Sequence, residues 1–98
     1  MNKKFIKITF DLYCEWNKKP PSYRVFFNGE LFAERTYIWK DHYLQELLQV
    51  NAEPGHYLVD IENLNPELGS FTVTNQRIDY GPAEWVNKKY VEIKHESQ

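Results

Sequence analysis

Residues 5–16 read FIKITFDLYCEW, and along this stretch apolar and polar side chains alternate. The even positions from Ile6 to Trp16 are apolar, whereas the odd positions from Lys7 to Glu15 are polar or carry a polar tip. Because successive side chains of a β-strand point to opposite faces of its sheet, this period of two predicts a strand with one buried and one solvated face. A slip of one residue would bury charged side chains, so we expect a firmly fixed register.

Turn signals divide the rest of the chain at a spacing typical of β-sandwiches. Asn28 and Gly29 are the strongest of these signals, because both residues tolerate the positive φ that a tight hairpin requires. Between the turns we predict strands at residues 23–27, 30–39, 56–62 and 70–74, a continuation at Ile78 and Tyr80 after a break at Asn75 and Gln76, and a last strand at residues 88–94.

Residues 43–50 fit two kinds of element. Their three leucines have the spacing of a helix, with Asp41 as its N-cap. The alternate positions from Leu44 to Val50 also fit a strand, whose inward face then includes Glu46. We favour the strand, because the neighbouring segments on both sides are predicted strands.

These elements predict the fold class and the extent of the domain. The chain has 98 residues, which suits one domain, and we expect a single all-β domain over residues 1–98. Its predicted architecture is an antiparallel, jelly-roll-like β-sandwich of about seven or eight strands. The ordered core is expected at residues 5–94, and the polar tail at residues 95–98 is expected to fray.

Composition narrows the classes of partner and the compartment. The net charge is −2, from 12 basic and 14 acidic residues, so we predict no nucleic-acid partner. Cys14 is the only cysteine, which excludes an internal disulfide and favours a reducing compartment. No stretch reads as a signal peptide or a transmembrane segment, so we expect no membrane partner and a cytoplasmic or virion-associated protein.

The chain carries no motif of a known catalytic centre, and we predict that it is not an enzyme and has no catalytic residues. Cys14 lies on the apolar face of the first predicted strand, where a free cysteine acts as a small hydrophobic residue. Asp60 and Glu62 alternate to one side of a strand, as the two carboxylates of a glycosidase do. A solvated sheet face explains this pair equally well.

Aromatic residues and polar loops supply the candidate ligand-binding residues. Large rings next to polar groups suit sugar rings and protein hot spots, although rings of this size also cap the ends of a small core. We expect no cofactor, but calcium prefers oxygen ligands of the kind that Asp41, Asn65 and Glu67 carry. The candidate ligand-binding residues are Trp39, Asp41, His42, Asn63, Asn65, Glu67 and Trp85.

Two resemblances extend this interpretation. Residues 23–31 (YRVFFNGEL), 54–63 (PGHYLVDIEN) and 71–73 (FTV) follow the order of elements in calcium-dependent xylan-binding modules, which the chain resembles over roughly residues 23–80. This resemblance implies a jelly-roll-like sandwich that binds a glycan and calcium. Residues 11–16 (DLYCEW) and 80–84 (YGPAE) are similar to uncharacterised small proteins of tailed phages of marine bacteria, which implies a virion or host-interaction protein.

We therefore expect a non-catalytic binding or structural module, of the kind a phage encodes as a virion or host-interaction protein. Its partner is expected to be a protein or a second copy of the chain. Phe26 and Phe27 are adjacent, so one sheet face cannot bury both rings, and we predict a contact there. The alternative function is a carbohydrate-binding module with a sugar site, and a calcium ion, at the loop end of the sandwich.

Overall fold

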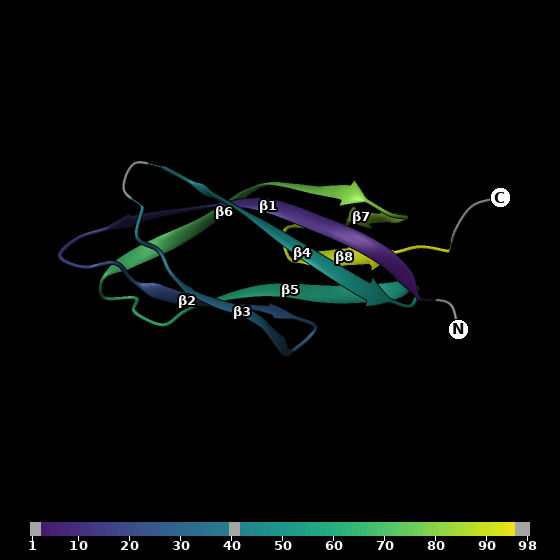
Figure 1. Cartoon of the computed structure of the whole chain (residues 1–98), viewed down its shortest axis with the longest axis horizontal. Coiled ribbons are helices and arrows are strands. Elements are labelled where there is room, and N and C mark those ends of the chain that lie inside the picture. The colour runs from purple at the N-terminus through teal and green to yellow at the C-terminus, as the bar shows by residue number, and fades with distance from the viewer. Residues whose placement is uncertain (1–2, 40–41, 96–98) are drawn as a thin grey trace.

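A computed structural model describes residues 3–39 and 42–95. Its strands form two antiparallel sheets, with the strand orders β4-β1-β6 and β3-β2-β5-β8-β7 (Figure 1). The prediction of an all-β sandwich of seven or eight strands is therefore confirmed. The strands are β1 (Lys4–Trp16), β2 (Ser22–Phe27), β3 (Glu30–Thr36), β4 (Leu44–Ala52), β5 (Gly55–Asn63), β6 (Gly69–Tyr80), β7 (Ala83–Trp85) and β8 (Tyr90–Ile93).

The inward face of β1 is the centre of the core, as its alternation predicts. Its even positions from Ile6 to Cys14 are buried and belong to one cluster with residues of both sheets. The prediction of a solvated outer face is wrong in the middle of β1, where Thr9 and Asp11 are buried because side chains of β6 cover them. The described residues contain no helix that is long and apolar enough to cross a membrane.

The ambiguous segment is a strand. β4 alternates between buried and exposed positions, and its inward face includes the carboxylate of Glu46. The strand that precedes β4 in the chain, β3, belongs to the opposite sheet and ends at Thr36 instead of the predicted residue 39. The reason is Tyr37, whose buried hydroxyl donates to the carbonyl oxygens of Leu12 and His42 and draws the chain from one sheet toward the other.

The C-terminal third differs from the prediction in three places. β6 runs on through the predicted break, because a bulge with a positive φ at Asn75 absorbs the irregularity. β7 was not predicted; it has three residues, too few for a pattern, and forms a hairpin with β8. β8 begins at Tyr90, two residues after the predicted start, because Asn87 turns the chain there by accepting from the N–H groups of Lys89 and Tyr90.

The second sheet is staggered about β5, and this stagger positions the candidate site. β8 pairs with β5 from Gly55 to Leu58, whereas β2 pairs with it from Val59 to Asn63. β8 begins opposite Leu58. Beyond that residue, no described strand pairs with the edge of β5 that faces β8. The sandwich therefore has an open margin between this half of β5 and β6.

Candidate functional site

The tryptophans singled out as candidates are packed against the core instead of being displayed on loops. Trp39 is partly buried, packs edge-on against Tyr37, and accepts a hydrogen bond from Trp16 Nε1 at its carbonyl oxygen. Trp85 is partly buried, packs edge-on against Phe10, and lines a groove described below. Of the two, Trp85 alone lines that groove.

The polar candidates either form hydrogen bonds with backbone groups of their loop and the adjoining strands or are exposed. The Asn63 amide donates to the carbonyl of Gly69 and accepts from the N–H of Asn65, while the Asn65 side chain accepts from the N–H of Ser22. Glu67 and His42 are exposed, and Asp41 lies outside the described residues. Within the described part of the chain, no three His, Cys, Asp or Glu side chains form a cluster that would hold a metal.

The sequence candidates for catalysis do not share one face, because Cys14 faces the core whereas Asp60 and Glu62 lie on the outer face of the five-stranded sheet. Cys14 is buried, and this burial raises the pKa of its thiol. Asp60 and Glu62 lie opposite Phe26 and Arg24 on the outer face of the five-stranded sheet, where Glu62 forms an ion pair of 3.8 Å with Arg24. These two carboxylates belong to a solvated sheet face.

The open margin contains a groove of about 550 Å³, which we call the β5–β6 groove. Its volume lies within the range typical of ligand pockets, roughly 300–1,000 Å³. Polar side chains at its border include Asn63, Gln76, Lys88 and Lys89. Its apolar lining comes from both sheets and consists of Phe10, Val59, Ile61, Phe71, Val73 and Trp85.

One wall of the β5–β6 groove is a strand edge without a neighbour. The N–H of Val59 donates to the carbonyl of Lys89 at 2.7 Å, and this is the last backbone bond between β5 and the β8 side. Backbone groups of a strand point alternately to its two sides, so those of Ile61 and Asn63 point the same way as those of Val59. These groups face the groove margin, where the structure describes no strand to pair with them.

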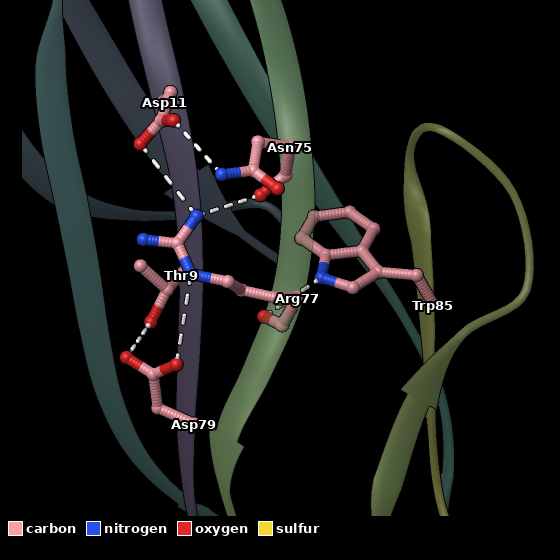
Figure 2. A network of polar contacts seen from close by, with 6 residues as sticks. All are labelled: Thr9, Asp11, Asn75, Arg77, Asp79 and Trp85. Carbon is pink, nitrogen blue, oxygen red and sulfur yellow. Dashed lines mark hydrogen bonds and ion pairs between the residues drawn. The ribbon is translucent and has the colours of Figure 1, made fainter.

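The opposite wall is β6, and a polar network on the outer face of the three-stranded sheet fixes its shape (Figure 2). The Arg77 guanidinium lies 3.6 Å from Asp11 and 3.7 Å from Asp79, while Thr9 donates to Asp79 at 2.7 Å. Asn75, at the bulge, donates to Asp11 at 3.1 Å. This network ties the bulge of β6 to β1 and so holds the wall in place.

Two cross-links close the β7 end of the groove. The Trp85 indole Nε1 donates to the carbonyl of Arg77 at 3.1 Å, which joins β7 to the free edge of β6 (Figure 2). The Gln76 amide donates to the carbonyl of Lys88 at 3.2 Å, which holds the β7–β8 loop against β6. Lys88 and Lys89 are exposed on that loop, and within the described chain neither side chain forms an ion pair.

The opposite margin of the sandwich, between β3 and β4, is bridged by charge. The Arg35 Nε donates to the buried Glu46 carboxylate at 2.9 Å, and the Tyr23 hydroxyl donates to the same carboxylate oxygen. Burial raises the pKa of Tyr23 far above its usual range, and the hydrogen bond to Glu46 raises it further. A smaller hollow of about 410 Å³ lies beyond this bridge, beside Leu31 and Tyr57.

Comparison with known proteins adds no relative to this description. No protein-family model matches the chain, and neither does any curated protein or solved structure. The resemblances to xylan-binding modules and to phage proteins thus stay predictions. The sequence analysis missed the β5–β6 groove, and it placed Lys88 and Lys89 in the last predicted strand instead of the turn that precedes β8.

Proposed function

We propose that this chain is a non-catalytic binding module that takes an extended segment of a protein partner into its β5–β6 groove. The observation that carries the proposal is the combination of an apolar groove with an unpaired strand edge along one wall. An added strand forms main-chain hydrogen bonds with such an edge, and an adjacent pocket then selects its side chains. The module is thus a protein-recognition unit, which suits the expected virion or host-interaction role.

The rings of the candidate residues favour this proposal over the glycan alternative. A sugar site at the loop end would need the ring faces of Trp39 and Trp85 to be presented to solvent. Both rings are partly buried against the core instead. The side-chain amides of Asn63 and Asn65 already form hydrogen bonds with backbone groups of their loop and of the adjoining strands β2 and β6.

A filling variant tests the proposed function. Random decapeptides are displayed with free C-terminal ends in one library and as internal segments in a second, and peptides enriched on the native chain are then measured on variants. Val73→Phe adds a ring inside the β5–β6 groove, so it is expected to weaken the enriched peptides at least about tenfold, the equivalent of roughly 1.4 kcal/mol. Leu31→Phe adds the same kind of bulk at the opposite margin and is the matched control.

The expected result is enrichment from at least one library, loss of binding with Val73→Phe, and unchanged binding with Leu31→Phe. Enriched peptides that bind Val73→Phe as tightly as the native chain would place the binding surface elsewhere. Failure of both libraries to enrich any peptide would contradict the proposed function itself.

A further inference from the structure

We propose that the β5–β6 groove reads the C-terminal end of its partner, with the free α-carboxylate held by Lys88 and Lys89. This inference rests on the proposed function and adds a direction and a chemical end group to it. The partner segment would form a short strand antiparallel to β5 and lie opposite residues 60–63.

The position of β8 determines where an added strand would lie. β8 is antiparallel to β5, and its first residue, Tyr90, lies opposite Leu58. Lys89 follows the same line, because its carbonyl accepts from the N–H of Val59. A strand added beside Asp60–Asn63 would therefore lie end to end with β8, in the row that β8 leaves empty.

The empty row beside β5 is closed at one end. The loop before β8 occupies the row at Lys89, and Lys88 turns from there toward β6, where Gln76 holds its carbonyl. A segment in the middle of a longer chain would have to bend out of the sheet at this point. A chain that ends there fits without a bend, so the closed end favours a terminus.

The direction of the added strand determines which terminus of the partner meets the two lysines. A strand antiparallel to β5 runs in the same direction as β8, so its last residue is the one that meets Lys88 and Lys89. A parallel strand would instead bring its α-ammonium group to the two ammonium groups of the lysines. Charge complementarity therefore selects the antiparallel strand and its carboxylate.

The lysines are suited to this role because their loop is anchored while their side chains are exposed. The Asn87 side chain accepts from the N–H groups of Lys89 and Tyr90 at 2.8 and 2.9 Å. Among the residues that line the groove, Asp60 is the acidic one, and its position opposite Phe26 puts it on the outer sheet face. The α-carboxylate of a strand added beside β5 would therefore meet the ammonium groups of Lys88 and Lys89 at the end of the groove.

Side-chain selection follows from the register. Paired residues of an antiparallel ladder point to the same face, and Ile61 belongs to the inward face of β5 with Val59. The partner residue opposite Ile61 would thus point at Val73 and Trp85, and an apolar side chain would fill the groove there. The inferred ligand is a C-terminal segment of extended conformation with an apolar residue close to its end.

Two synthetic peptides test the inference: acetyl-Ser-Thr-Val-Thr-Val-Val with a free carboxylate, and the same peptide as its C-terminal amide. We expect the free acid to bind the native chain at least about tenfold more tightly than the amide, because the neutral amide cannot form the charge-assisted hydrogen bonds that the carboxylate forms with the lysines. The double variant Lys88→Gln, Lys89→Gln is expected to remove this preference. Lys18→Gln, Lys19→Gln changes the net charge equally at the β1–β2 loop and should preserve it.

The outcomes separate the inference from the proposed function. Equal affinity for the acid and the amide, or a preference that survives the Lys88–Lys89 double variant, would overturn the inference and leave the groove as a binder of internal segments. Binding of neither peptide would also overturn it, and the display libraries would then decide the proposed function independently.

Discussion

The two open margins of the sandwich are bridged in different ways. Between β3 and β4, the buried carboxylate of Glu46 in β4 accepts hydrogen bonds from Tyr23 of β2 and Arg35 of β3, and so joins the two sheets. Between β5 and β6, the hydrogen bonds of the Trp85 indole and the Gln76 amide close only the β7 end, and the remainder is an apolar groove. A buried charge needs all its partners, whereas an unfilled apolar groove beside an open strand edge is suited to receive a ligand. We therefore assign stability to the first margin and binding to the second.

The largest expected effect on stability comes from removing the Glu46 carboxylate at the β3–β4 margin. Glu46→Ala removes the acceptor of the buried Tyr23 hydroxyl and leaves a cavity, so the free energy of unfolding should fall by about 2–4 kcal/mol. Urea denaturation measures this change. Glu34→Ala is the control, because Glu34 pairs with Arg24 at the surface and such pairs contribute about 0–1 kcal/mol. Equal losses from both variants would show that the Glu46 bridge is no more than a surface contact.

A pH titration tests the contribution of Tyr23 to stability at the same margin. Burial and the Glu46 hydrogen bond raise the pKa of Tyr23 in the folded state, whereas an unfolded tyrosine ionises near pH 10. The unfolded state thus releases a proton that the folded state keeps, so stability is full below pH 10 and falls above it. Each such group contributes a slope of about 1.4 kcal/mol per pH unit.

Tyr23→Phe removes this group and should flatten the alkaline fall in the free energy of unfolding. Burial also raises the pKa of Tyr37, so part of the slope is expected to persist in the variant. Urea titrations between pH 8 and 11 compare the two chains. Identical slopes would mean that Tyr23 ionises in the folded state as readily as in the unfolded state.

The indole cross-link gives a smaller effect. Trp85→Phe keeps a ring against Phe10 but loses the donor to the Arg77 carbonyl, and about 1 kcal/mol of stability should be lost with it. Thermal and urea denaturation measure the loss. A change as large as that of Glu46→Ala would mean that the β6–β7 contact, and not the charged bridge, is the main closure of the sandwich.

The smallest expected effect concerns the groove itself. Val73→Phe enlarges a side chain that faces open space, so the free energy of unfolding should change by less than about 1 kcal/mol. If the groove were closed core, overpacking would cost about 1–3 kcal/mol instead. Urea denaturation of the variant therefore distinguishes an open binding groove from a packed interior.

Local patterns in the sequence predict most of the strands, but they do not predict which side chains meet at the margins of the sandwich. β1 is long and alternates clearly, so its inward residues from Ile6 to Cys14 could be predicted one by one, whereas the burial of the outward Thr9 and Asp11 under β6 could not. The inward position of Glu46 followed from the alternation in β4, yet its partners Tyr23 and Arg35 lie in β2 and β3. Partners of this kind depend on how distant strands are aligned, which no local pattern encodes.

The β5–β6 groove was out of reach for the same reason. It arises because β2 and β8 pair with different halves of β5, and that stagger is a property of three strands together. Trp85 stood out as an aromatic residue after a turn, but a strand of three residues gives no pattern from which to tell that its ring faces inward. The sequence therefore shows the residue types that line the groove but not that the fold brings them together.

The assignment of binding to the β5–β6 margin is tested most directly by a ¹⁵N NMR titration of the native chain with the free-acid peptide. We predict that the largest shifts fall on the amides of Ile61, Asn63 and Lys89 and on the Trp85 indole N–H, while those of Leu31 and Gln49 at the β3–β4 margin stay unchanged. Shifts centred on Leu31 and Gln49, or no shifts at a peptide concentration of several millimolar, would contradict the account.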